Sequence, residues 1–472
     1  MPRHAVAIGL LLLLTLSPSA AVPQSATVLD WTALGDEAVA LLSRLLQTDT
    51  VNPPGNEIAA ARLLKEVFDR EGIEARVLES DPGRGSVWAR LRGDGSRPSV
   101  VLLNHLDVVP FERQNWSVDP LGGAIKDGYV WGRGALDMKG MGAVEAVVLI
   151  ALKRAGVPLR GDVVFLGTAD EEAGGRKGAG FLVNRHWDLV KDAGVVINEG
   201  SSINRDAAGQ LYYGVAVSEK VPLPIRLVAK GTAGHGSVPR TDNPVHRLVT
   251  ALHRIATYAT PIKVLPEVQS YYAAVAPFQS APSSERFRDL RAALEDPAIA
   301  AELLKSNPFM NARTRNTISI NMVEGSGKIN VIPSEASAQI DVRLLPGEDA
   351  AVFLAELRRI IADAAVTIEA TPRAAAAVSS PLVHPFFDAL DAVRQANDPA
   401  AVMTTPLLTA ATDCRYFRSR GVACYGFLPF VLSVKDYDGF HGNDERLSVE
   451  NVHRGTRLLY DVVRRLAADP VK

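Results

Sequence analysis

The chain has 472 residues, which is too many for a single hydrophobic core, so two or more domains are expected. Its hydrophobic content of 47% and charged content of 22% are typical of a globular protein. The net charge of −2 argues against a nucleic acid or an anionic membrane surface as a partner.

The first residues have the pattern of a secretory signal peptide. A short basic start precedes an apolar stretch over 5–16, which is too short to span a bilayer comfortably, and small residues follow at 17–21. We therefore expect residues 1–25 to be removed, leaving no stable membrane anchor, and the protein to be exported to the periplasm or the extracellular space. The alternative is an uncleaved anchor. An oxidising compartment permits a bridge between Cys414 and Cys424, with two buried thiols as the alternative.

The chain after residue 30 predicts a layered α/β domain, because helical apolar spacing alternates with apolar runs typical of buried strands. The predicted helices cover 38–46, 59–68, 140–154 and 179–186, and the predicted strands cover 75–78, 86–91, 99–103, 162–168 and 193–198.

From about residue 220 the pattern changes to that of a smaller α+β domain with split βαβ order. Its predicted strands cover 223–230, 316–323, 336–344 and 366–370, and its helices cover 243–257 and 349–363. An insertion over about 261–315 carries helical stretches at 284–294 and 297–305. After residue 380 helices over 385–397 and 451–467 and a strand over 423–427 return to the α/β pattern. The sequence thus predicts one domain over 26–219 and 373–472, into which a second domain over 220–372 is inserted.

His105 and Asp107 follow the apolar run 99–103, and open α/β sheets place their active sites at such strand ends. Two residues apart on a strand, they share a face, and a metal-bound histidine needs a carboxylate on its second nitrogen. Taken alone, such a histidine is more often structural than a ligand.

Further acidic residues and a histidine lie at strand ends or in loops. They are Asp137, Glu171, Glu172, Glu199 and His441. Each alone has a structural alternative, such as a helix cap, a solvated charge or an ordinary loop histidine. Together with His105 they converge on one rim of the sheet. Five of these six residues, as His and carboxylate ligands without cysteine, suit a catalytic site with two zinc ions bridged by one carboxylate.

The order of these motifs resembles a known family. The motifs are His-x-Asp, Gly-x-x-Asp-Met-Lys-Gly, Asp-Glu-Glu, Asn-Glu-Gly and His-Gly-x-Asp-Glu-Arg. Nearly all of the chain after the signal peptide is similar to the co-catalytic zinc aminoacylases and carboxypeptidases, a group with aminoacylase-1, glutamate carboxypeptidase, acetylornithine deacetylase and succinyl-diaminopimelate desuccinylase. The resemblance implies a three-layer α/β catalytic domain with an inserted ferredoxin-like lid or dimerisation domain.

The resemblance also implies a role for each motif residue. Asp137 would bridge two zinc ions, for which Co²⁺ or Mn²⁺ could substitute. His105 and Glu199 would complete one metal site, and Glu172 and His441 the other. Asp107 would orient His105, Glu171 would be the general base, and the Asp137–Met138 peptide would be cis.

Four further residues are implied on the substrate side. His235, in a Gly-rich turn of the small domain, would stabilise the developing oxyanion, often from the partner subunit of a dimer. Asn330 and Arg343 match positions that bind the terminal carboxylate of the substrate, and Arg415 is a further candidate. The alternatives are a plain turn histidine and surface ion pairs for the arginines.

The expected function is that of an exported two-zinc amidohydrolase that acts on N-acyl amino acids or on short peptides with a free C-terminal carboxylate. A dipeptidase or carboxypeptidase of the same family is the alternative. A non-catalytic binding protein on this fold would lack the base or a ligand, and neither is missing. The lid domain could form a homodimer, or the insertion could cover that face in a monomer.

Overall fold

The computed structural model describes Met1, residues 28–370 and residues 378–469. Apart from Met1, the predicted signal peptide lies outside the described residues, as does the predicted domain boundary at 373. Within the described part of the chain, no helix combines the length and the apolar character needed to cross a bilayer.

The larger body is built on an eight-stranded sheet. Its strands are β1 (Glu74–Glu79), β2 (Gly85–Leu91), β3 (Ser99–His105), β6 (Val163–Thr168), β7 (Ala193–Arg205), β8 (Leu211–Gly214), β16 (Val402–Thr404) and β17 (Ala423–Leu432). They follow the order β1-β2-β6-β3-β7-β8-β16, with β17 paired to β7. Strand β3 is parallel to β6 and β7, and β17 is parallel to β7, so the carboxyl ends of these strands share one rim.

Helices cover both faces of this sheet, which gives three layers. One core contains α1 (Trp31–Leu46), α2 (Glu57–Arg70), α3 (Lys139–Arg154), α12 (Pro385–Asn397) and α15 (Val449–Ala467). The other contains α4 (Ala179–Arg185) and α13 (Cys414–Arg418). Strand β3 is buried throughout, and its side chains divide alternately: Val100 and Leu102 join the first core, Val101 and Leu103 the second. A strand buried on both faces explains the continuous apolar run in the sequence.

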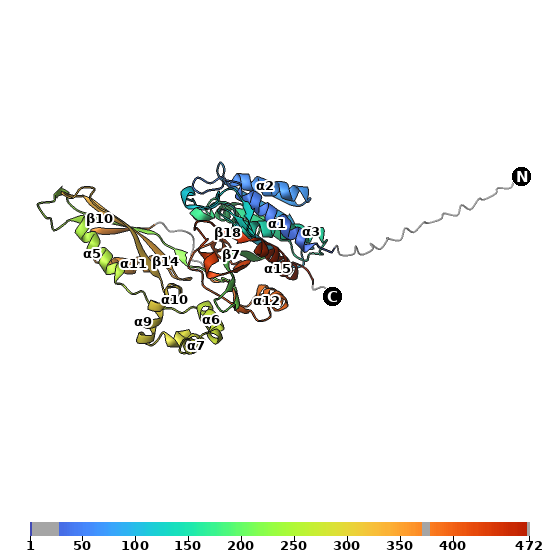
Figure 1. Ribbon diagram of the computed structural model, residues 1–472. Helices are drawn as coiled ribbons and strands as arrows, with labels where there is room; N and C mark the ends of the chain where they lie inside the picture. Colours follow the sequence, from blue (N-terminus) through green and yellow to red (C-terminus); the bar gives the residue numbers. More distant parts are fainter. Residues whose placement is uncertain (2–27, 371–377, 470–472) are drawn as a thin grey trace.

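The smaller body is a five-stranded antiparallel sheet with two helices. Its elements are β9 (Val221–Pro222), β10 (Ile225–Lys230), α5 (Pro244–Ala256), β12 (Thr317–Glu324), β14 (Glu335–Leu344), α11 (Ala350–Ile361) and β15 (Val366–Ala370). The order is β12-β14-β10-β15, with β9 paired to β14, and a separate pair joins β11 (Gly234–His235) to β13 (Val331–Ile332). Figure 1 shows this body beside the larger one. The predicted fold class, an α/β domain with a smaller inserted α+β domain, is confirmed.

The insertion between α5 and β12 is helical. It contains α6 (Pro266–Val275), α7 (Ser283–Arg288), α8 (Leu290–Ala293), α9 (Pro297–Ser306) and α10 (Pro308–Arg313). The single helix predicted over 284–294 is divided at Asp289, whose side chain accepts a hydrogen bond from the backbone N–H of Ala292 and so caps α8. The core of the insertion includes Tyr212 and Leu407 of the larger body, so its helices pack against that body.

The remaining elements are short. They are β4 (Ala124–Lys126), β5 (Tyr129–Trp131), β18 (Arg446–Ser448), α14 (Val434–Tyr437) and the 3-10 turns η1 (Arg113–Asn115), η2 (Glu171–Ala173), η3 (Trp187–Leu189) and η4 (Ala276–Phe278). Strands β18, β5 and β4 form one small sheet, which ties the segment after His441 to the segment before Asp137.

Glu145 is a buried acid at the centre of α3. Asn104 Nδ2 donates to its Oε2 at 2.7 Å, and its other oxygen has no partner among the described residues. Burial raises the pKa of the Glu145 carboxyl well above the ordinary value of 4.5. Because the folded state disfavours the charged form, ionisation of Glu145 opposes folding, and this penalty is absent below pH 4.5 and grows as the pH rises.

We expect Glu145→Gln, which mimics the neutral acid, to stabilise the fold at pH 8 by about 1–3 kcal/mol. The gain should shrink as the pH falls toward 4.5. Urea unfolding of both proteins from pH 4.5 to 8 measures the difference in the free energy of unfolding. A difference that does not change with pH would mean that Glu145 is not held neutral.

Candidate active site

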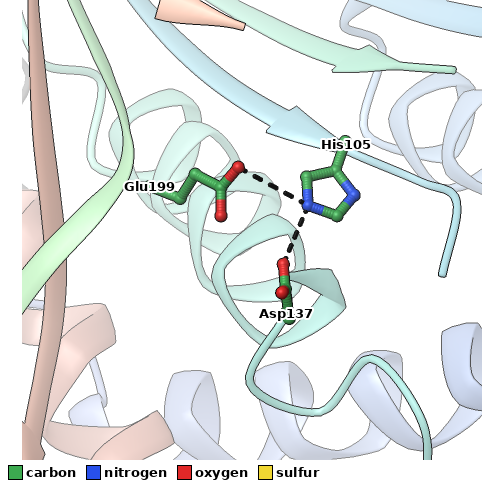
Figure 2. A group of neighbouring side chains, drawn as sticks. All are labelled: His105, Asp137 and Glu199. Atoms are coloured by element: carbon green, nitrogen blue, oxygen red, sulfur yellow. Dashed lines mark hydrogen bonds and ion pairs between the residues drawn. The ribbon is translucent and has the colours of Figure 1, made fainter. Parts of the chain in front are cut away.

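Five side chains predicted from the sequence meet at the carboxyl rim of the large sheet in two groups that share Asp137. In the first group, His105 Nε2 lies 3.0 Å from Asp137 Oδ1 and 3.7 Å from Glu199 Oε1 (Figure 2). In the second, His441 Nε2 lies 3.1 Å from Asp137 Oδ2 and 3.2 Å from Glu172 Oε2. Within each group the candidate ligand atoms lie within 4.8 Å of one another.

The local structure explains how each residue reaches the rim. His105 ends β3, Glu172 lies in η2 after β6, and Asp137 precedes α3 in a glycine-rich loop. The Asp137–Met138 peptide is cis, as expected. Glu199 differs from the prediction, because it does not end its strand: β7 continues to Arg205 past Gly200.

The composition and burial of the two groups suit bound metal ions. They place three largely buried carboxylates, those of Asp137, Glu172 and Glu199, beside two imidazoles. Burial raises the pKa of Glu172, and burial and the Asp137 charge raise that of Glu199, so the ionised cluster is unfavourable without compensating positive charge. Glu172 Oε1 is buried and has no hydrogen-bond partner among the described residues. An acceptor without a donor suits a cation, and His with carboxylate is a typical zinc donor set.

The Asp107 carboxylate has a different contact pattern from the one predicted. His105 Nδ1 lies 3.0 Å from the backbone carbonyl oxygen of Asp107 and 3.6 Å from its carboxylate, so the carbonyl is the closer acceptor for the ring. The carboxylate instead accepts the backbone N–H groups of Glu171 at 3.0 Å and Glu172 at 3.1 Å, and Asn52 Nδ2 at 2.8 Å. Asp107 therefore holds the Glu171–Glu172 turn, and its backbone orients the histidine.

A buried ion-pair network that the sequence did not reveal supports the same turn. Arg84 donates to both carboxylate oxygens of Glu57, at 2.8 and 2.6 Å, and to Asp170 Oδ1 at 3.0 Å. The backbone of Asp170 has φ of 71°, a left-handed conformation that a residue with a side chain adopts only under constraint. The ion pairs supply that constraint. Glu57 and Arg84 are not part of a recognisable sequence motif, so their roles could not be predicted from the sequence. Those roles arise from contacts between residues far apart in the chain.

Glu171 belongs to neither metal group. It is partly buried, and burial and the nearby Glu199 charge raise the pKa of its carboxyl well above 4.5. A carboxyl group with a raised pKa, next to two candidate metal groups, suits general acid–base chemistry.

Arg415 lies in α13, next to the disulfide between Cys414 and Cys424 that the structure contains. The Arg415 guanidinium packs on the Tyr416 ring at 5.1 Å, and its Nη2 is buried without a hydrogen-bond partner among the described residues. A surface ion pair therefore does not describe this arginine. Its buried, unpaired donor next to the acidic cluster is available to an anionic group.

The other three substrate-side candidates lie on the smaller body. His235 is exposed in β11 and bonds Ser237, with Nδ1 to Oγ at 2.7 Å. Arg343, in β14, donates to Asp341 at 2.9 Å in a partly exposed ion pair, which is the alternative named for it. Asn330 is exposed, and its backbone carbonyl accepts from Gly236. Within the described residues, none of the three forms a hydrogen bond to the two metal groups.

Comparison with known proteins finds similarity to metallopeptidases and aminoacylases along most of the chain. The model of peptidase family M20/M25/M40 matches residues 101–465. A probable carboxypeptidase S-like 2 of Dictyostelium discoideum is 29% identical over 382 residues, 79% of this chain and 72% of its own. The mouse N-fatty-acyl-amino acid synthase/hydrolase PM20D1 is 28% identical over 78% of this chain and 75% of its own. Pig aminoacylase-1 is 27% identical over 92% of this chain and 96% of its own.

Solved structures share the fold. An M20 family metallo-carboxypeptidase, Sso-CP2 of Sulfolobus solfataricus, aligns with a TM-score of 0.71 at 18% identity over 91% of this chain and 99% of its own. The Bacillus subtilis YXEP protein, described as a dinuclear metal-binding peptidase of the M20 family, aligns with a TM-score of 0.58 at 13% identity over 92% of this chain and 98% of its own.

Proposed function

The chain belongs to peptidase family M20/M25/M40 and is a metal-dependent hydrolase of amide or peptide bonds, and on this basis we propose that it is a two-zinc enzyme. Its proposed substrates are N-acyl amino acids or short peptides with a free C-terminal carboxylate. Co²⁺ or Mn²⁺ are proposed substitutes for zinc. A dipeptidase or carboxypeptidase activity is the second candidate, because a relative named as carboxypeptidase S-like also matches the chain.

The observation that carries the proposal is the division of one carboxylate between two histidines. Asp137 presents Oδ1 to His105 and Oδ2 to His441. His105, Asp137 and Glu199 would hold one ion, and Asp137, Glu172 and His441 the other. Zinc ions at such a site supply Lewis acidity, which stabilises negative charge as it develops on oxygen during amide hydrolysis.

Glu171 is the residue we assign to proton transfer. Its carboxylate would accept a proton from the attacking water and then donate it to the nitrogen of the leaving amine. Glu172 cannot have this role while its Oε2 lies 3.2 Å from His441 in the second metal group. The Asp107 bonds to the backbone N–H groups of both glutamates keep one carboxylate in the metal group and leave the other free.

The substrate class is proposed from the relatives and from charge. The names of the matched relatives include hydrolases of N-acyl amino acids and a carboxypeptidase, and in both kinds of substrate the amino acid to be released already has a free α-carboxylate. Arg415 supplies a guanidinium beside the acidic cluster, and its buried Nη2 has no hydrogen-bond partner in the described part of the chain. Asn330 and Arg343 remain proposed carboxylate contacts, which would require the lid to approach the larger body.

The test is hydrolysis of matched substrates by the purified protein. N-acetyl and long-chain N-acyl amino acids and dipeptides are compared with the same compounds methylated at the terminal carboxylate. We expect cleavage that requires the free carboxylate, stops after treatment with a chelator and returns with Zn²⁺. Faster cleavage of dipeptides than of N-acyl amino acids would favour the second candidate, and full activity after metal removal would exclude the zinc mechanism.

We also propose a homodimer through the lid domain. Strand β12 is an edge of the five-stranded sheet, and its side chains Met322 and Val323 are 49% and 58% exposed. Val249 of α5 is 56% exposed. An apolar edge strand is a template for pairing with another chain. His235 would then act on the active site of the partner subunit, because it lies outside both metal groups of its own chain.

A charge on this edge is expected to separate the subunits. Val323→Lys should convert a dimer to a monomer in sedimentation velocity and lower kcat about 100-fold, the loss expected for one oxyanion donor. His235→Ala should lower kcat by a similar factor while the protein stays a dimer. Ile125→Lys, an equally exposed site on the larger body, is the control. A wild-type monomer with full activity would contradict the dimer.

Export and domain division are proposed from the sequence pattern. We propose cleavage of the signal peptide at residues 1–25, a periplasmic or extracellular location, a catalytic domain over 26–219 and 373–472, and a lid domain over 220–372. Amino-terminal sequencing of the protein secreted by its host tests the cleavage, and a mature chain that begins at Met1 would contradict it.

A further inference from the structure

Glu445 of the His-Gly-x-Asp-Glu-Arg motif belongs to neither metal group, although it lies only four positions after His441 and is completely buried. Its Oε1 accepts the backbone N–H groups of Leu136 at 2.7 Å and Asp137 at 3.0 Å. Its Oε2 accepts the backbone N–H of Gly134 at 2.9 Å and Arg133 Nη1 at 2.7 Å. One carboxylate therefore fixes the backbone of the loop that carries Asp137.

Arg133 continues this contact to the other loop. Its Nη2 donates to the backbone carbonyl oxygens of Gly442 at 2.8 Å and His441 at 3.3 Å. The Arg133 side chain is 2% exposed and its guanidinium lies over the Trp116 ring at 5.1 Å, so packing fixes its orientation. The Arg133–Glu445 pair thus joins the loop of Asp137 to the loop of His441.

His441 depends on its backbone for its position more than His105 does. The side chain of His441 is 54% exposed, whereas that of His105 is 2% exposed at the end of a buried strand. The backbone of His441 has φ of 56°, in the left-handed region that a residue with a side chain adopts only when its surroundings enforce it. The two carbonyl bonds from Arg133 act on that segment.

We propose that Arg133 and Glu445 are positioning residues that set the metal affinity of the group formed by Asp137, Glu172 and His441. This inference rests on the proposed two-metal function. The pair touches the backbone of Asp137 and His441, while His105 and Glu199 are held by β3 and β7. Loosening the pair should therefore weaken the His441 group more than the His105 group.

The test uses two variants that keep the charges of the pair. Arg133→Lys retains one cation but cannot reach Glu445 and both carbonyls together, and Glu445→Asp shortens the carboxylate. The control for a general loss of stability is Val463→Ala, which leaves a cavity beside α15, away from both loops. Each metal-depleted protein is titrated with Zn²⁺ in competition with a chromophoric chelator, and thermal unfolding of the metal-free forms is recorded.

We expect two equivalents of Zn²⁺ in the wild type and in Val463→Ala. In Arg133→Lys and Glu445→Asp one equivalent should weaken 10–100-fold, the usual effect of losing a partner that orients a ligand, and the other should weaken less. Two unchanged affinities, or equal weakening of both, would overturn the inference. A wild type that binds fewer than two equivalents would instead contradict the proposed function.

Discussion

Replacement of Glu171 by glutamine is expected to lower kcat about 10²–10⁴-fold while the protein keeps its zinc. Glutamine has the shape of glutamate but cannot take the proton of water. The side chain belongs to neither metal group, so the candidate ligands remain in place. Steady-state kinetics with the best substrate found for the wild type, together with elemental analysis for zinc, measures both effects.

The neighbouring residue supplies the matched control. Glu172→Gln alters a carboxylate that faces His441 at 3.2 Å, so it is expected to lose zinc as well as activity. Retained zinc in Glu171→Gln with lost zinc in Glu172→Gln would separate a base from a ligand one residue apart. Turnover of Glu171→Gln within tenfold of the wild type would show that the base is another residue.

Replacement of Asp137 by alanine is expected to empty both metal groups. Each group contains one oxygen of this carboxylate, so a single change removes a donor from both. Zinc after dialysis should fall from two equivalents to fewer than one. Activity should fall by about 10³-fold or more, because metal ions supply several kcal/mol of transition-state stabilisation.

A graded comparison sharpens this result. Asp137→Asn keeps one carbonyl oxygen and is expected to retain more zinc than Asp137→Ala, whereas His441→Ala should retain the ion of the His105 group. Circular dichroism checks that each variant folds. Two equivalents of tightly held zinc in Asp137→Ala would contradict a carboxylate shared by two ions.

Much of the fold could be predicted because its signals are local. The apolar run that became β3 and the helical spacing that became α15 depend on neighbours within a few residues. Predictions were less exact where tertiary contacts decide. Glu199 was predicted to end a strand, but β7 continues because residues up to Asn204 pair with β17. The helix at 284–294 is divided at Asp289.

The candidate site shows the same division. The chemical nature of the cluster followed from residue types and their places after apolar strands. The contacts that hold it did not, since Arg133 and Glu445 are 312 residues apart, and Glu57 and Asp170 are 113 residues apart. Even at two residues' separation, sequence spacing could not show that the His105 ring has the Asp107 carbonyl, and not its carboxylate, as its closer acceptor.

The layered α/β class, the smaller α+β unit and the set of residues that meet at the carboxyl rim could all be predicted from the amino-acid sequence. Periodicity and strand ends encode these features locally, and a shared rim follows from parallel strands. The three-dimensional structure was needed to show how Asp137 divides its two oxygens between His105 and His441, and which buried groups hold the two glutamates apart. Those features depend on ångström-scale distances between segments far apart in the chain, which are fixed by packing of the whole domain.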